Sequence, residues 1–182
     1  MYVQVVRGSP HRADRLRQEW AALRADSEAS VAGLTATGEW IAALRHGGPD
    51  TRPGDVLPAA VSACFPLPPE VVGSPDAHLV LAGTPAPGAA FIQVMRARVA
   101  DRAGWAAADA DAVPRFAAAR PDFLGSLRVW GADLLTVVDS FSSEAAARAG
   151  EAVVPEPADQ AAYVRWFSYL TEVSWHDLVE LW

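Results

Sequence analysis

The chain has 182 residues, a net charge of −7 and no lysine or asparagine, so all of its 15 basic residues are arginines. They form no cluster of the kind that binds nucleic acid, and the single Cys64 excludes an internal disulfide and a multi-cysteine metal site. No apolar run approaches the roughly 20 residues of a membrane span, and the first strand begins at the second residue. We therefore expect a cytoplasmic protein that contacts neither nucleic acid nor membrane.

The first part of the chain predicts a strand, a helix and a hairpin. Residues 2–8, YVQVVRG, alternate as a strand does. Ser9 and Pro10 are typical of a helix start, and Leu16, Trp20 and Leu23 then form an apolar stripe that ends near residue 26. Residues 30–45 predict a hairpin that turns around residues 37–39.

Residues 47–77 interrupt this regular pattern. Nine of the fourteen prolines lie between residues 47 and 87, which argues against a long regular helix there. Residues 78–83, HLVLAG, then predict a fourth strand. The Gly- and Pro-rich residues 83–90 predict a linker.

The remainder of the chain repeats the plan more regularly. FIQVMRARV (residues 91–99) predicts a strand, and Asp101 a helix cap. GSLRVWGADLLTVVDSF (125–141) predicts a hairpin, followed by a helix that begins at Ser142 or Ser143. The last elements are an aromatic-rich helix over residues 158–170 and a strand over 173–182.

The two parts align with each other, which predicts an internal duplication. Residues 2–7 lie over 91–96 with Gln over Gln and Arg over Arg, and His78 lies over His176. The predicted domains are residues 1–82 and 91–182, joined by a linker at 83–90. Each reads β-α-β-β-α-β, so the expected fold class is α+β with two tandem ferredoxin-like units.

Three segments carry a resemblance to a known family: FIQVMRARV, GSLRVWGADLLTVVDSF and the phrase DSFSSEAAAR that follows the hairpin. They resemble the antibiotic-biosynthesis-monooxygenase-like group of the dimeric α/β-barrel superfamily, well over residues 91–182 and passably over residues 2–46. The resemblance implies that two units in one chain bury their sheet faces against each other, forming a pseudo-dimeric barrel within a monomer or a loose homodimer. It also implies a small-molecule site between a sheet and its helices, which we expect in the more regular second half.

Two residues are candidates for catalysis, and four for ligand binding. His176 could move a proton and Arg96 could hold an anionic oxygen, although a strand histidine and a sheet arginine can equally serve structure through partners of their own. The aromatic side chains could wall a pocket for a flat ligand or fill the core. These are Trp130, Tyr163, Trp166 and Phe167.

The resemblance implies an enzyme of secondary metabolism that oxygenates or rearranges an aromatic or polyketide-like metabolite without a tightly bound cofactor. Oxygenases and haem-degrading members of this superfamily often use an asparagine, and this chain has none. The four histidines are scattered without metal-ligand spacing, so we expect no metal site. The alternative is a non-catalytic small-molecule carrier or interaction protein of the same fold.

Overall fold

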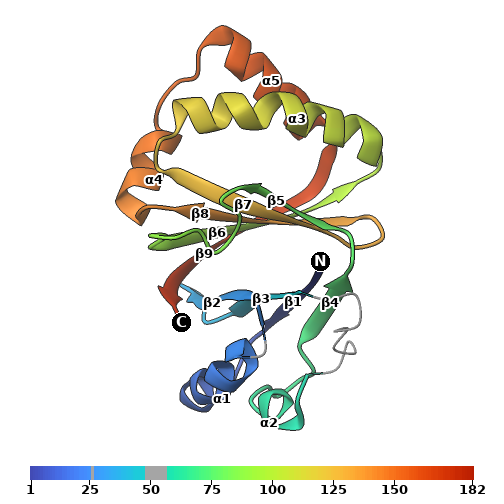
Figure 1. The fold of residues 1–182 in the computed structure, drawn as a ribbon, viewed down its shortest axis with the longest axis vertical. Helices are drawn as coiled ribbons and strands as arrows, with labels where there is room; N and C mark the ends of the chain where they lie inside the picture. Colours follow the sequence, from blue (N-terminus) through green and yellow to red (C-terminus); the bar gives the residue numbers. More distant parts are fainter. Residues whose placement is uncertain (26, 48–56) are drawn as a thin grey trace.

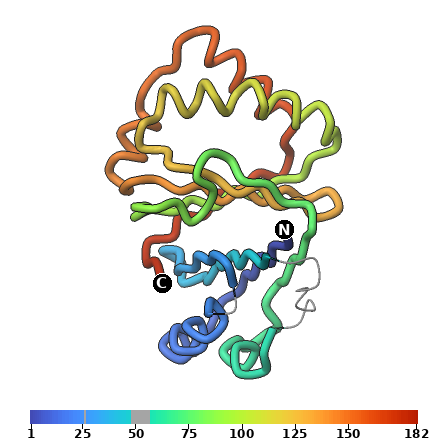
Figure 2. Tube along the Cα trace, in the orientation of Figure 1, coloured from blue at the N-terminus to red at the C-terminus, as the bar shows by residue number. Residues whose placement is uncertain are grey.

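The computed structural model describes residues 1–25, 27–47 and 57–182, which form one continuous nine-stranded sheet folded into two layers that face each other, with helices on both outer sides (Figures 1 and 2). The elements of the first half are β1 (Tyr2–Gly8), α1 (Ala13–Ala25), β2 (Ala29–Thr35), β3 (Trp40–His46), α2 (Ala59–Ser62) and β4 (Glu70–Ser74). The others are β5 (Ala77–Leu81), β6 (Phe91–Val99), α3 (Arg102–Ala119), β7 (Phe123–Trp130), β8 (Leu134–Phe141), α4 (Glu144–Glu151), α5 (Pro157–Ser168) and β9 (Leu170–Leu181).

The strand order confirms two ferredoxin-like units. The strands follow the order β4-β1-β3-β2-β9-β6-β8-β7-β5. The runs β4-β1-β3-β2 and β9-β6-β8-β7 each place the first strand of a unit between its third and fourth strands, with the second strand beyond the third. The pairs within each unit are antiparallel, as a ferredoxin-like sheet requires.

Two links join the units, one on each side of the barrel. Only Pro75 and Asp76 separate β4, which pairs with β1, from β5, which pairs with β7 of the other unit. On the opposite side β9 pairs with β6, and its last residues pair with β2 of the first unit. Leu178 therefore lies opposite both Ile92 and Thr35 and joins the two units.

The alternation of β6 separates the inter-sheet core from the helix-side core. Ile92 and Val94 belong to an apolar cluster between the two sheets, whereas Phe91 and Met95 belong to clusters beneath α3, α4 and α5. Between the sheets lie Val3, Val5, Val31, Ile41, Ala43, Ile92, Val94, Leu127, Val129, Val138 and Leu178. Both faces of β6 are thus apolar and buried.

The first unit fills the space beneath its helices with large rings. Trp20 on α1 meets Trp40 on β3 edge to face, with 5.8 Å between ring centroids, and Phe65 lies 5.9 Å from Trp40. Leu16 and Val61 complete this cluster and are almost fully buried. No helix in the described ranges is long and apolar enough to span a membrane.

The predicted local signals at the second unit's helices are present. The Asp101 carboxylate accepts a hydrogen bond from the Gly104 amide at 2.9 Å, and Ser143 Oγ accepts one from the Ala146 amide at 3.1 Å. In the first unit α1 begins at Ala13 instead of directly after Pro10. The segment before it is held elsewhere, because the His11 amide donates to the Cys64 carbonyl at 3.0 Å.

Two predictions about the fourth strands are wrong. The fourth strand of the first unit is Glu70–Ser74, and the predicted strand HLVLAG instead pairs with β7 of the second unit. The pairings of Val6 with Val71 and of Met95 with Trp175 also set the register, so His176 corresponds to Val72 and not to His78. The domain boundaries 1–82 and 91–182 stay a prediction.

Candidate functional site

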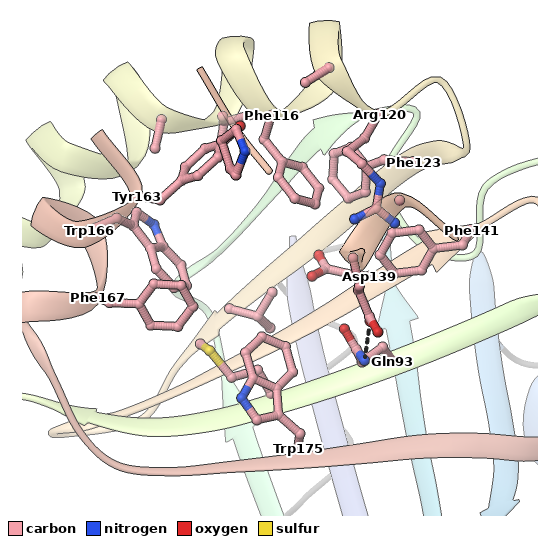
Figure 3. A pocket seen from close by; sticks show the side chains of 18 of the residues that line it. Gln93, Phe116, Arg120, Phe123, Asp139, Phe141, Tyr163, Trp166, Phe167 and Trp175 are labelled. Atoms are coloured by element: carbon pink, nitrogen blue, oxygen red, sulfur yellow. Dashed lines mark hydrogen bonds between the residues drawn. The ribbon is translucent and has the colours of Figure 1, made fainter. Parts of the chain in front are cut away.

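A cavity of about 640 Å³ lies between the sheet of the second unit and its helices α3, α4 and α5 (Figure 3). Its size suits an organic molecule of several fused rings, and its lining is mainly apolar. Figure 3 shows aromatic side chains on opposite sides of this space. The lining rings are Phe116, Phe123, Phe141, Tyr163, Trp166, Phe167 and Trp175.

Small residues on the helices leave this space open. Besides Asp109 and Phe116, helix α3 faces the cavity with Ala112, Val113 and Ala119, whose short side chains fill little of it. Helix α4 has only eight residues, and the connection from α4 to α5 contributes Val153 and Pro155 to the wall. The second unit thus surrounds a hollow with rings, in contrast to the ring-filled first unit.

A buried set of two carboxylates and one guanidinium lines the cavity. Asp109 Oδ1 accepts from the Trp166 indole at 2.8 Å and from Arg128 Nη2 at 3.3 Å. Arg128 Nη1 also donates to Asp139 Oδ1 at 3.3 Å. All three charged side chains are at most 15 % exposed, so they interact in a medium that screens charge weakly.

Asp139 is the carboxylate best suited to exchange a proton. Burial raises its pKa above the ordinary value, while the neighbouring Arg128 and a hydrogen bond from Ser126 act in the opposite direction. A carboxylate with a raised pKa beside an apolar ligand space is a stronger base than an aspartate in water. Asp139 can therefore accept a proton from a bound molecule.

A second polar group connects the cavity to α4 and β9. Gln93 donates from Nε2 to Asp177 Oδ1 at 3.0 Å and to Glu151 Oε1 at 3.3 Å. Arg148 forms ion pairs with the same two carboxylates. These pairs hold α4 against β6 and β9 beside the cavity.

Three of the four predicted ligand-binding side chains line the cavity. They are Tyr163 and Trp166, which are partly buried on α5, and Phe167, which is 46 % exposed. Trp130 does not line it: it is 4 % exposed and packs edge to face on Trp105, with 5.2 Å between ring centroids. Trp130 is a core residue of the second unit.

The two predicted catalytic residues lie on the other face of the sheet, so their assignment to the ligand cavity is wrong. Arg96 and His176, which is paired with Val94, both face the first unit. Arg96 Nη1 donates to Glu70 Oε2 at 2.9 Å, and His176 Nδ1 lies 3.2 Å from Glu39 Oε2. Burial, with Arg7 nearby, lowers the pKa of His176.

Sequence reasoning missed Asp109, Arg128 and Asp139, although each carried a signal. Arg128 and Asp139 are the charged residues of the second hairpin's two strands, β7 and β8. Asp109 lies four residues after Trp105 on the buried side of α3. Across residues 1–25, 27–47 and 57–182, no group of three or more metal-ligating side chains could hold a metal ion.

No protein-family model matches the chain, and no curated protein sequence matches it. Solved structures do match over almost its whole length. A candidate monooxygenase from Lactobacillus acidophilus has a TM-score of 0.69 at 11% identity, with 98% of this chain and 92% of that chain covered. An anthrone oxidase-like protein has a TM-score of 0.58 at 12% identity, with 100% and 92% covered.

A third matching structure is described as related to antibiotic biosynthesis monooxygenases. It is a ferredoxin-fold protein from Listeria monocytogenes, with a TM-score of 0.56 at 10% identity. The match covers 98% of this chain and 95% of the Listeria chain. The chain therefore has the tandem ferredoxin-like fold of the antibiotic-biosynthesis-monooxygenase-like proteins, as the sequence predicted.

Proposed function

We propose that the protein binds a flat aromatic or polyketide-like metabolite in the second-unit cavity and oxygenates it without a tightly bound cofactor. The observation that carries this proposal is a ring-walled cavity of about 640 Å³ lined by a carboxylate with a raised pKa, Asp139. Aromatic walls favour stacking with a flat ligand. The descriptions of structures with the same fold, a candidate monooxygenase and an anthrone oxidase-like protein, support the reaction class.

The chemistry requires a substrate with an acidic C–H next to aromatic rings and a carbonyl. Asp139 accepts one proton, and the remaining electron pair spreads over the rings and the carbonyl oxygen. This carbanion reduces O₂ and forms a C–O bond, and Asp139 returns its proton to give a C–OOH group. Loss of the second C–H proton with cleavage of O–O releases water and leaves a new carbonyl, so CH₂ and O₂ become C=O and H₂O.

The non-catalytic alternative rests on the partners of the polar side chains. Arg128 contacts both Asp109 and Asp139, and the Trp166 indole donates to Asp109. Side chains that hydrogen-bond to one another in this way also stabilise a core without any reaction. In that case the cavity would bind and carry the same class of molecule unchanged.

The test combines binding and turnover with anthrone as the probe. Quenching of tryptophan fluorescence should report binding, because Trp166 and Trp175 line the cavity. In air we expect the quinone absorption to appear, and without oxygen we expect binding only. The Asp139→Asn variant should still bind and lose turnover by about 100-fold or more.

The Asp133→Asn variant is the matched control, because that carboxylate is 61 % exposed on the hairpin turn and lies outside the cavity lining. It should retain full turnover. Turnover of the native protein should rise with pH through a value above the ordinary pKa of an aspartate, since Asp139 must be ionised to act. Saturable binding without any product would refute the proposed enzymatic activity and support the non-catalytic carrier.

A further inference from the structure

Arg120 is a buried guanidinium in the wall of the ligand cavity. Its side chain leaves the C-terminal end of α3 and is 7 % exposed, although arginine is rarely buried without partners. In Figure 3 it lies among the rings of Phe123 and Phe141, at the opposite side of the space from Tyr163 and Trp166. Arg120 is not part of the buried set formed by Asp109, Arg128 and Asp139.

Two hydrogen-bonding partners fix the orientation of this guanidinium. Nε and Nη2 donate to the two carboxylate oxygens of Asp122 at 2.9 and 2.7 Å, and Nη2 also donates to the Ala147 carbonyl at 3.0 Å. Arg120 in turn lowers the pKa of Asp122. This fork-like pairing neutralises the charge and leaves the group little freedom to move.

Packing fixes it from the sides as well. The guanidinium carbon lies 5.3 Å from the Phe116 centroid and 5.4 Å from the Phe141 centroid. Gly150 on α4 allows a close approach, since a Cβ there would lie 2.0 Å from Arg120 Nε and 2.3 Å from its Cζ. Any larger residue at position 150 would displace the guanidinium.

One terminal nitrogen of Arg120 remains for a ligand. Nη1 makes no hydrogen bond to any of the residues that the structure describes, whereas Nε and Nη2 are fully engaged. A donor in the wall of a cavity can pair with a polar atom of a ligand that enters the cavity. Because Asp122 already balances the charge, Nη1 suits an oxygen with partial negative charge better than a free inorganic anion.

We propose that Arg120 Nη1 binds a phenol or ring-carbonyl oxygen of the molecule in the cavity and thereby selects ring systems that carry such an oxygen at one end. This assignment rests on the proposed function for its ligand class. It adds a role in the reaction: when Asp139 removes a proton, negative charge spreads to the ring oxygen, and a fixed N–H donor stabilises that charge. Arg120 would then favour oxygenated aromatic compounds over plain hydrocarbons.

The test uses 2-hydroxyanthraquinone, whose visible absorption changes when its phenol ionises. The double variant Arg120→Gln/Asp122→Asn removes the guanidinium without leaving an unpaired buried charge. The Gly150→Ala variant keeps Arg120 and displaces it. The pair Arg15→Gln/Glu19→Gln is the control, since it removes an ion pair on α1 whose residues lie outside the cavity.

In the native protein and the control pair, the pKa of the bound phenol should be lower than in the two test variants by about one unit or more. The test variants should also lose about tenfold in affinity for the dye relative to anthracene, which has no oxygen. Gly131→Ala, whose Cβ would find its nearest neighbours at 3.5 Å, controls for a glycine substitution and should behave as native.

The outcomes separate the two proposals. Binding of the dye with the same phenol pKa in every variant would overturn the role of Arg120 and leave the proposed function standing. Failure of the native protein to bind either the dye or anthrone would overturn the proposed function, and the role of Arg120 with it. Circular dichroism at the assay temperature should confirm that each variant is folded.

Discussion

The indole N–H of Trp166 ties α5 to α3 at the cavity wall, and Trp166→Phe removes that donor while keeping an aromatic ring. The bond runs 2.8 Å to Asp109 Oδ1, and Asp109 is only 6 % exposed. A hydrogen bond to a charged group contributes about 1.5–3 kcal/mol. The smaller ring also weakens contacts with Trp105 and Phe167, at 5.6 and 4.9 Å between centroids, for about 1 kcal/mol more.

We therefore expect Trp166→Phe to lower the free energy of unfolding by about 2–4 kcal/mol, measured by urea denaturation followed by circular dichroism. Trp175→Phe is the matched control. Trp175 lines the same cavity, is 46 % exposed, and its indole nitrogen makes no hydrogen bond to the described part of the chain. The free energy of unfolding of Trp175→Phe should fall by less than about 1 kcal/mol. Equal losses in the two variants would refute the view that the bond to Asp109 anchors α5.

Leu178→Ala should lower the free energy of unfolding by about 3 kcal/mol, because Leu178 is 2 % exposed between the two units; Val179→Ala, at a position that is 54 % exposed, should cost less than about 0.5 kcal/mol. Two separate unfolding transitions would contradict a shared core. Asp139→Asn should remove a pH dependence of the free energy of unfolding. Because the pKa of Asp139 is raised in the folded state, the folded protein holds a proton that the unfolded chain has already lost. The native protein should therefore lose stability relative to the variant as pH rises from about 4 through the raised pKa. A constant difference in urea denaturation across that range would argue against a raised pKa. Sedimentation at low micromolar concentration should show a monomer, or a dimer joined through outer surfaces, because the inner sheet faces are already buried against each other; a dimer with swapped units would exclude this arrangement.

Periodicity and capping were sufficient to predict the two units. The hairpins, the caps Asp101 and Ser143 and the aromatic helix α5 all depend on contacts close in sequence. Which strand another strand pairs with depends instead on contacts between residues far apart in the sequence. Residues 77–81 have an ordinary strand pattern, and that pattern cannot show that the chain leaves the first sheet at Pro75 and joins the second.

The prediction that Arg96 and His176 line the cavity failed for a related reason. Alternation correctly separated Gln93 and Met95 from Val94 and Arg96, but both faces of β6 are apolar and buried, so periodicity could not show which face meets the helices. Arg96 was therefore assigned to the wrong face of the sheet. The set formed by Asp109, Arg128 and Asp139 comes from three elements and becomes recognisable only once their packing is known.

The unequal filling of the two units has a consequence for stoichiometry. A barrel made from two identical subunits must build the same interior twice, so every change that opens one hollow opens both. Here the two interiors have different side chains, and Trp20, Trp40 and Phe65 occupy the space beneath the first unit's helices. The first unit is then free to serve as a rigid support behind the second unit's sheet, and we expect a titration to saturate at one ligand per chain.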